Sequence, residues 1–248
     1  MPTRSTDLIS SRENRWFRRF RDASLRHREE ILLEGPKQVA DALARGWSPL
    51  AFAVSAGVEP PSASAAAAVR FAPALVRELT DARHPQGLFA LFERPAPALD
   101  DALERPRLLV VLDGIQDPGN VGAIIRTAAA FEASGVLLTE GCADPFAPKA
   151  LRASAGTALL LPIVELARKA LAAELERRSI PLYAAAAGGD PVRIELPAAI
   201  VFGSEGRGVS EELMRRSRPV SIPISGSVES LNVAAAAAIL IHAATREG

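Results

Sequence analysis

Three turns in the second half of the chain hold the residues whose types could do chemistry. The turns read DGIQDPGNVGAIIRTA from Asp113, GSEGRGVS from Gly203 and SGSVESLNVAAA from Ser225, and each follows an apolar run. Glycine lets a backbone amide approach a ligand closely, and amide, hydroxyl and charged side chains hold a ligand by hydrogen bonds. The side chains of these kinds that could meet at one site are Asn120, Arg126, Glu205, Ser230 and Asn232.

Each turn, taken alone, also has an ordinary structural interpretation. Asn120 is a preferred helix-capping residue, and Arg126 would suit a solvated surface. The turn from Gly203 could be a tight connection capped by Ser210, although its three glycines bracket two charged residues. Asn232 stands in an otherwise apolar segment and needs a hydrogen-bond partner if it is buried. For each turn, the functional and the structural interpretation both stay open at this point.

Missing motifs exclude several other chemistries. The chain has no G-x-G-x-x-G turn and no G-x-x-x-x-G-K-[ST] loop, so neither a dinucleotide site nor ATP hydrolysis is supported. Cys142 is the only cysteine, so it can form no intramolecular disulfide and no thiolate metal cluster. We expect Cys142 to be a small, partly buried residue, and we expect the site to need no metal.

The bulk composition is that of a globular protein with two domains. The chain has 248 residues, 48% of them hydrophobic, which fits one domain of about 100 residues and one of about 150. Lys and Arg together number 29, and so do Asp and Glu together. The net charge is therefore zero and gives no indication of a nucleic-acid partner. The longest apolar stretch, 233–244, is shorter than the roughly 20 residues that cross a bilayer. We therefore expect no membrane span. The first twenty residues lack the apolar core of a secretory signal, and Asp7 and Glu13 weaken the case for an organelle presequence. We expect a cytoplasmic location.

The expected elements alternate between strand and helix. In the first half we expect helices over 11–27, 39–44 and 74–79 and strands over 31–33, 50–54, 69–71 and 88–92. The proline-rich stretch 94–107 is typical of a connector rather than a packed element. Beyond it, strands over 108–112, 136–139, 159–163, 181–185, 199–203 and 220–224 alternate with helices over 120–133, 148–154, 165–178, 211–217 and 228–245. This pattern predicts an α/β protein with a mainly parallel sheet. It also predicts two domains, 1–98 and 106–248, on either side of the connector.

The segment between Arg12 and Arg28 concentrates positive charge in an otherwise neutral chain. It holds seven arginines against two acidic residues. Four large apolar residues recur among them near helical spacing, which predicts a helix, capped by Ser11, with one apolar and one basic face: Trp16, Phe17, Phe20 and Leu25. Guanidinium groups suit phosphate clamping, although a solvated face explains this segment equally well on its own. The candidate RNA-binding residues are Arg12, Arg15, Arg18, Arg19 and Arg21.

Together the three turns resemble the motifs of the SpoU, or TrmH-like, branch of the SPOUT RNA methyltransferases. The matching strings are LDGIQDPGNVGAIIRTAAAF at 112–131, IVFGSEGRGVS at 200–210 and IPISGSVESLNVAAAAAILI at 222–241. DPFAPKALRASAG at 144–156 is also similar to this family, and LLEGPKQVADAL and LTDARHPQGLFAL are similar to its usual RNA-binding domain. The resemblance covers nearly the whole chain. Its departures are Ser204, where asparagine or alanine is frequent, and Glu132, where glycine is common.

The resemblance implies a fold, a cofactor and a partner. The C-terminal domain would be closed by a trefoil knot, and a smaller N-terminal α/β domain would bind RNA. Members are usually homodimers, and the apolar helix 231–244 would then serve both the knot and the interface. S-adenosylmethionine would bind at the knotted loops, where the matched residues are Phe202, Gly203, Gly208, Ile222, Ser230 and Leu231.

The implied reaction is methyl transfer to a ribose 2′-hydroxyl, with ribosomal RNA favoured over transfer RNA. An in-line displacement needs an aligned nucleophile that loses its proton. Because arginine stays protonated, we expect Arg126 to clamp the target phosphate and stabilise developing negative charge, in its own or the partner subunit's site. Asn120, Glu205, Ser230 and Asn232 would position the reactants, with Glu205 orienting Arg126. Three alternatives stay open: a transfer-RNA enzyme, a base-nitrogen methyltransferase of the wider superfamily, and an inactive RNA-binding or ribosome-assembly factor of the same fold.

Overall fold

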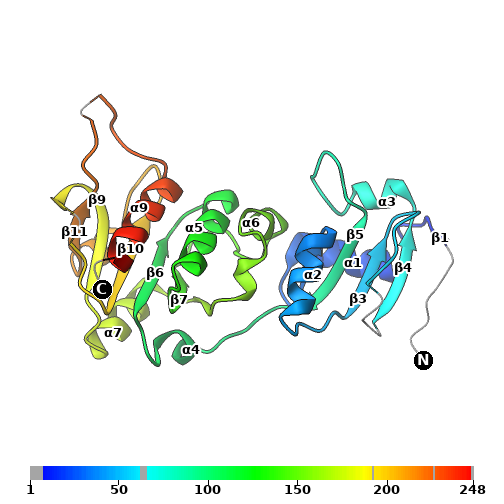
Figure 1. Cartoon of the computed structure of the whole chain (residues 1–248), viewed down its shortest axis with the longest axis horizontal. Helices are drawn as coiled ribbons and strands as arrows, with labels where there is room; N and C mark the ends of the chain where they lie inside the picture. Colours follow the sequence, from blue (N-terminus) through cyan, green and yellow to red (C-terminus); the bar gives the residue numbers. More distant parts are fainter. Residues whose placement is uncertain (1–7, 62–65, 192, 226, 247–248) are drawn as a thin grey trace. The chain divides into compact units, whose positions relative to one another are not determined.

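The structure is a computed structural model that describes residues 8–61, 66–191, 193–225 and 227–246 (Figure 1). The chain falls into two compact units: Met1–Pro95 together with Phe146–Gly156, and Ala96–Pro145 together with Thr157–Gly248. The first unit therefore includes α6 (Pro148–Ala153), although the sequence on either side of this helix belongs to the second unit. Within the described ranges, no helix combines enough length and apolar character to cross a membrane.

The first unit is built on a mixed sheet. Among its described residues the strand order is β1 (Leu8–Ile9), β4 (Ala67–Phe71), β3 (Ala51–Val54), β5 (Leu88–Glu93), β2 (Glu30–Glu34). β1, β4 and β3 run parallel, whereas β5 is antiparallel to both β3 and β2. β3 is buried along its whole length because it lies between two other strands. Helices α1 (Arg15–Arg26), α2 (Pro36–Ala44) and α3 (Pro73–Arg77) complete the unit with α6.

Helix α1 joins the core of the first unit through aromatic side chains. Phe17 and Phe20 each pack edge-to-face on Phe71, with ring centroids 5.7 and 5.6 Å apart. Leu25, which was predicted on the same apolar face, is 65% exposed, so that prediction was wrong. A position five residues after Phe20 is turned roughly 140° around the helix, and Ala23 takes the buried place instead.

The cap of α1 also differs from the prediction. The Oδ1 atom of Asn14 accepts a hydrogen bond from the backbone N–H of Trp16 at 2.9 Å, so Asn14, and not Ser11, caps the helix. Ser11 precedes the helix start by one turn, and its hydroxyl accepts a hydrogen bond from the N–H of Glu13. Both are preferred capping residue types, so the sequence alone did not separate them.

The second unit is built on a parallel sheet. In its described part the strand order is β11 (Arg218–Ser221), β9 (Leu182–Pro191), β10 (Ala198–Gly203), β6 (Leu108–Asp113), β7 (Gly135–Leu138), β8 (Ile163–Glu165). Every neighbouring pair in this order is parallel. The predicted α/β fold with a mainly parallel sheet is therefore confirmed.

Helices cover both faces of this sheet (Figure 1). Helices α5 (Pro118–Ala130) and α9 (Val233–Arg246) pack against each other, and α9 contacts β10. Alternate residues of β6 point to the other face, where α4 (Leu99–Leu103), α7 (Arg168–Arg177) and α8 (Glu211–Met214) join one core with Leu109 and Val111. All of β6 is buried, as is typical of a central parallel strand.

Two predictions for the second unit were wrong. The stretch predicted as a connector contains α4, whose Ala102 and Leu103 are buried in the core. Proline and acidic residues concealed this helix, but Asp101 stabilises its start by accepting a hydrogen bond from the N–H of Ala98 at 2.7 Å. The strand predicted over 159–163 is instead a 3-10 turn over 157–159 followed by β8, which begins directly after Pro162 because proline has no N–H to donate to a strand pair.

The other predicted strands and helices are present with shifted ends. The largest shifts are in β9, which extends to Pro191, and α9, which begins at Val233 rather than at 228. The short strand β1 was not predicted.

Candidate active site

A pocket of about 620 Å³ opens at the carboxyl ends of β9, β10 and β11. We call it the loop pocket; its walls come from β9, from the turn after β10, from the segment 220–225 and from the entry to α9. Pockets of this volume hold small molecules in other proteins. All six residues predicted to meet the cofactor line it: Phe202, Gly203, Gly208, Ile222, Ser230 and Leu231.

The turn from Gly203 to Ser210, which we call the β10 turn, closes so tightly that it requires glycine at its first position. A Cβ atom on Gly203 would lie 2.0 Å from the carbonyl carbon of Gly208 and 2.1 Å from the amide nitrogen of Val209. Gly208 pairs across the turn with Ser204 and has a φ of +67°, in the region that favours glycine. Ser210 stands at the N-cap of α8, but its side chain makes no capping hydrogen bond.

A directed series of hydrogen bonds links three side chains beside the loop pocket. The Oδ1 atom of Asn232 accepts hydrogen bonds from the N–H groups of Ala234 at 2.9 Å and Ala235 at 3.3 Å, at the start of α9. Its Nδ2 atom donates to Oδ1 of Asn120 at 3.3 Å, and Nδ2 of Asn120 donates to Oε1 of Glu205. Because α9 occupies the Asn232 oxygen, each amide must turn its nitrogen toward the next residue. The series must then end on an acceptor, and the Glu205 carboxylate is one.

Asn120 therefore does not cap α5, and the structural interpretation of this residue was wrong. Asp117 is the cap, since its Oδ1 atom accepts a hydrogen bond from the backbone N–H of Asn120 at 3.0 Å. Pro118 then occupies the first turn, where no N–H is needed. The side chain of Asn120 is left to reach Glu205 and Asn232, which lie 85 and 112 residues later in the sequence.

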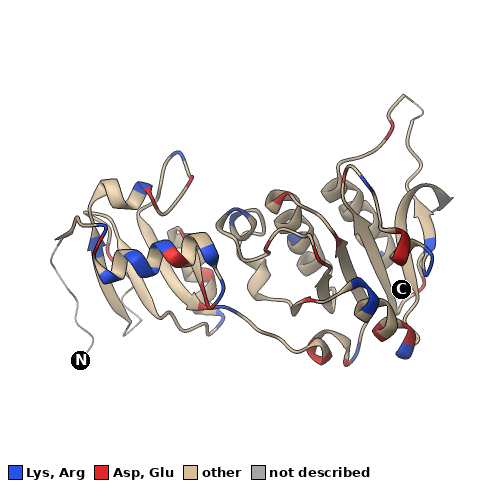
Figure 2. Ribbon diagram, turned by 180° about the vertical axis from the view of Figure 1, so that it is seen from behind, with Lys and Arg blue, Asp and Glu red and all other residues tan. Residues whose placement is uncertain are grey.

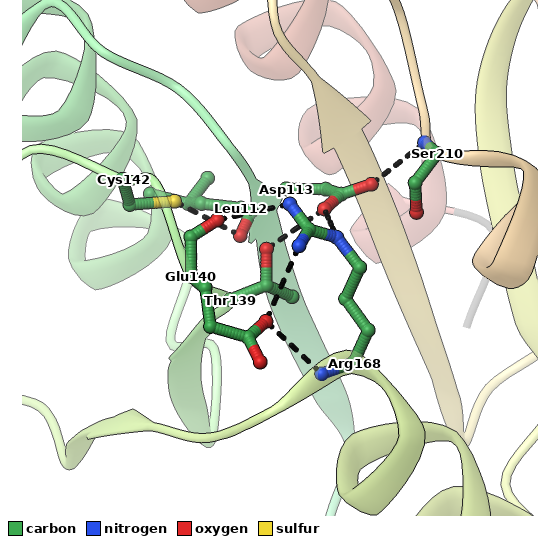
Figure 3. A network of polar contacts seen from close by, with 7 residues as sticks. All are labelled: Leu112, Asp113, Thr139, Glu140, Cys142, Arg168 and Ser210. Carbon is green, nitrogen blue, oxygen red and sulfur yellow. Dashed lines mark hydrogen bonds and ion pairs between the residues drawn. The ribbon is translucent and has the colours of Figure 1, made fainter.

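Asp113, which was not among the site residues predicted from the sequence, is the centre of a buried polar network (Figure 3). Its Oδ1 atom accepts hydrogen bonds from the Thr139 hydroxyl and from Nε of Arg168, both at 2.7 Å. Its Oδ2 atom accepts a hydrogen bond from the backbone N–H of Ser210, also at 2.7 Å. Burial by itself would raise the pKa of Asp113, but the hydrogen bonds from Ser210, Thr139 and Arg168 outweigh it and hold the pKa below its usual range. The signal in the sequence was one acid at the end of an otherwise apolar strand.

The structure brings together some of the predicted catalytic residues and leaves one apart. Glu205, Ser230 and Asn232 line the loop pocket, and Asn120 is bonded to two of them. Arg126 lies on α5, is exposed, and is not among the residues that line the pocket. Glu205 bonds to Asn120 rather than to Arg126, contrary to the expected pairing.

Arginine positions follow one another along the ribbon of α1 in the first unit (Figure 2). Three of the five candidate RNA contacts are paired with acids: Arg12 with Glu78, Arg18 with Glu13, and Arg19 with Glu30. Arg15 and Arg21 are exposed and have no acidic partner within the part of the chain that the structure describes. The guanidinium of Arg15 lies 5.7 Å from the centroid of the Trp16 ring. Arg15 and Arg21 therefore offer positive charge that is not already neutralised.

Cys142 is half-buried, as predicted. Its Sγ atom donates to the carbonyl oxygen of Leu112 at 3.2 Å, and burial raises the pKa of the thiol. Over the described residues, no three His, Cys, Asp or Glu side chains come together as a metal site.

Comparison with protein families identifies the second unit. The model of the SpoU rRNA Methylase family matches residues 107–242. The chain belongs to the SpoU rRNA methylase family. The SpoU match contains Asn120, Glu205 and Asn232, the Asp113 network and the loop pocket. The family resemblance predicted from the three turns is thus confirmed.

Individual relatives of this SpoU chain are RNA methyltransferases by name. An uncharacterized tRNA/rRNA methyltransferase of Synechocystis is 40% identical over 147 residues, which cover 57% of this chain and 54% of the relative. The 23S rRNA (guanosine(2553)-2′-O)-methyltransferase RlmP of Bacillus subtilis is 34% identical over 169 residues, which cover 66% of each protein. The chain thus aligns with about half to two thirds of the length of these curated relatives.

A solved SpoU structure resembles the chain over nearly its whole length. The crystal structure of the SpoU methyltransferase AviRb from Streptomyces viridochromogenes, in complex with the cofactor AdoMet, matches with a TM-score of 0.86 and 27% identity. The match covers 95% of this chain and 98% of that chain.

Proposed function

We propose that this SpoU family chain transfers a methyl group from S-adenosylmethionine to a ribose 2′-hydroxyl of RNA, with ribosomal RNA as the substrate. The observation that carries the proposal is the series from Asn232 through Asn120 to Glu205 beside a pocket large enough for the cofactor. The name of the Bacillus subtilis relative, a 23S rRNA 2′-O-methyltransferase, supports both the reaction and the class of RNA.

The loop pocket fits the methyl donor in size and chemistry. Its volume of about 620 Å³ suits a ligand of this size, and Gly203 leaves the backbone bare where a Cβ would collide with the β10 turn. When bound, S-adenosylmethionine supplies an electrophilic methyl group on a sulfonium. Ile222 and Leu231 would contact its apolar parts, while Ser230 and the backbone around Gly208 would hold its polar groups. The AdoMet complex of AviRb supports this assignment.

Arg126 would bind the target phosphate and stabilise negative charge on the attacking oxygen. A guanidinium stays protonated at any physiological pH, so it cannot itself remove the 2′-hydroxyl proton. The exposed position of Arg126 on α5, outside the residues that line the pocket, suits a site completed by a second copy of the chain. Asn120, Glu205, Ser230 and Asn232 would orient the ribose and the donor.

We further propose how the chain is divided into domains, how it is knotted and how it forms a dimer. Residues 1–98 would form the RNA-binding domain and 106–248 the methyltransferase domain. Arg15 and Arg21, which have no acidic partner among the described residues, would lie on the RNA surface. A trefoil knot is supported by the place of β10 between β9 and β6 and by the return of α9 to pack on α5 and β10. A homodimer through α9 is supported by Ile239, which is 43% exposed on this helix. We place the activity in the cytoplasm, where ribosomal RNA is modified in bacteria.

Methyl transfer from labelled S-adenosylmethionine to RNA tests the proposal. Ribosomal RNA and transfer RNA from cells that lack the protein would be offered separately, followed by nucleoside analysis and mapping of the modified position. A 2′-O-methylated nucleoside in ribosomal RNA is the expected product. A methylated base, or RNA binding without any transfer, would contradict the proposal and favour a base methyltransferase or an assembly factor; label only in transfer RNA would correct the substrate.

A further inference from the structure

Asp113 is the point where both ends of the β10 turn are held. Gly203, at the start of the turn, lies opposite Asp113 in the parallel pairing of β10 with β6. Ser210, at its end, donates its backbone N–H to the Asp113 carboxylate at 2.7 Å. Residues 204–209 thus form a loop, carrying Glu205, whose two ends are both fixed on one residue of the central strand.

The carboxylate of Asp113 is itself held firmly from the side away from Ser210 (Figure 3). The Thr139 hydroxyl, at the end of β7, and Nε of Arg168, at the start of α7, both donate to its Oδ1 atom. Arg168 is fixed in turn, because its Nη2 atom donates to the carbonyl oxygen of Glu140 at 2.9 Å. The network therefore connects the ends of two strands and the start of a helix to the β10 turn.

Core stability alone does not require a carboxylate at this place. Taking a charge out of water is unfavourable, and a well-packed apolar residue often stabilises a buried position as well or better. A fixed carboxylate offers something that an apolar side chain lacks, which is a directional hydrogen bond to the backbone of a turn. The Asp113 side chain is only 1% exposed, so water does not compete for that bond.

We propose that Asp113 is a positioning residue for the candidate active site. Its carboxylate, held by Thr139 and Arg168, fixes the β10 turn so that Glu205 meets Asn120 and the wall of the loop pocket keeps its shape. The inference rests on the proposed function of the loop pocket, and it adds a residue that touches neither the pocket nor the proposed substrate.

The substitution Asp113→Asn tests this role most directly. If the new amide keeps its oxygen toward Thr139 and Arg168, its NH₂ group faces the N–H of Ser210, and two donors cannot bond. If the amide turns over, the NH₂ group meets Arg168 instead. In the first arrangement the β10 turn loses its hydrogen bond to residue 113, and in the second the side chain of residue 113 loses its hydrogen bond from Arg168. The volume of the side chain hardly changes in either case. Asp101→Asn is the matched control, because Asp101 also accepts a backbone N–H but does so at the start of α4.

Two measurements distinguish a positioning role of Asp113 from a role in fold stability alone. Hydrogen exchange of the backbone amides of residues 204–209, without any donor present, should be at least about tenfold faster in Asp113→Asn than in wild type. Calorimetry with S-adenosylmethionine, well below the unfolding temperature, should show affinity about tenfold weaker or more. Asp101→Asn should leave both values unchanged. A lower unfolding temperature with unchanged exchange and affinity would overturn the proposal.

A milder pair of variants keeps the test decisive if Asp113→Asn does not fold. Thr139→Val removes one donor to Asp113 at nearly constant volume, and Thr139→Ser restores the hydroxyl. The first should speed exchange in the β10 turn and weaken donor binding, and the second should rescue both; equal values for the two variants would overturn the proposal. Wild-type protein that does not bind S-adenosylmethionine would instead refute the proposed function, while the exchange data would still decide the role of Asp113.

Discussion

Asn232 caps α9 with its side-chain oxygen and donates from its side-chain nitrogen to Asn120, a residue 112 positions earlier in the chain. One amide thus joins the start of the last helix to the start of α5. Because the oxygen is committed to the helix, the direction of every hydrogen bond from Asn232 to Glu205 is set. The relationship connects helix stability with the arrangement of the candidate active site.

Asn232→Asp should separate these two roles. An aspartate can still cap α9 through an oxygen, but it cannot donate to Asn120 and it adds a negative charge near Glu205. We expect the unfolding temperature to stay close to that of wild type while methyl transfer to RNA falls about tenfold or more. Thermal unfolding and initial rates with labelled donor measure the two effects. Equal loss of stability and activity would mean that the residue serves only as a cap.

Gly203→Ala should abolish donor binding through the shape of the β10 turn. The added Cβ would lie 2.0 Å from the carbonyl carbon of Gly208, so the backbone must move. Gly206→Ala is the matched control within the same turn, because no atom lies within 4 Å of its added Cβ. Calorimetry with S-adenosylmethionine should find binding lost in the first variant and retained in the second. Retained binding in Gly203→Ala would show that the wall of the loop pocket is not the donor site.

Arg126→Ala should abolish catalysis and leave donor affinity nearly intact. Arg126 does not line the loop pocket, so its loss removes charge from the proposed phosphate and oxygen positions only. Removal of one such stabilising donor lowers turnover by a factor of about 100 or more. Arg215→Ala, which removes another exposed arginine, at the end of α8, serves as the control. Loss of donor binding in a folded Arg126→Ala protein would contradict the assigned role.

Arg15→Ala combined with Arg21→Ala should weaken RNA binding and reduce its salt dependence. Each lost phosphate contact lowers the magnitude of the slope of log affinity against log salt by about 0.9 on B-DNA and by about 0.7 on single strands. Arg26→Ala is the control on the same helix, since Arg26 already pairs with Asp22 at 3.0 Å. Binding titrations at several salt concentrations measure the slopes. An unchanged slope in the double variant would place the RNA surface elsewhere.

The buried Asp113 predicts a loss of stability in acid. Its pKa is held below the unfolded value of about 3.9, so the ionised form stabilises the fold above that pH. This contribution is lost as the pH falls through the lower folded pKa. The stability advantage of wild type over Asp113→Asn should therefore shrink as the pH drops below about 4. Denaturant unfolding across this pH range measures the difference in the free energy of unfolding between wild type and Asp113→Asn. A difference that does not change with pH would show that Asp113 is not ionised in the folded protein.

The sequence by itself determined the class of fold and the positions of the glycine-bearing turns. Alternating apolar runs and helical periodicities are local patterns, and they predicted the parallel sheet whose carboxyl ends carry all three turns. The same patterns failed where local signals conflict, as in α4, where proline and acids concealed a helix that the core buries through Leu103. The prediction for Leu25 was wrong for a similar reason. Only packing against the core shows which face of α1 is buried, and Leu25 lies outside that face.

Only the tertiary structure decided which polar groups meet. Asn120 was identified from its turn, but its partners Glu205 and Asn232 are 85 and 112 residues away. The direction of their hydrogen bonds depends on a helix cap that no spacing encodes. Asp113 looked like the last residue of a strand until Thr139, Arg168 and Ser210 converged on it. Hydrogen bonds are short and directional, so their pairing follows from the folded path of the chain and not from the order of its residues.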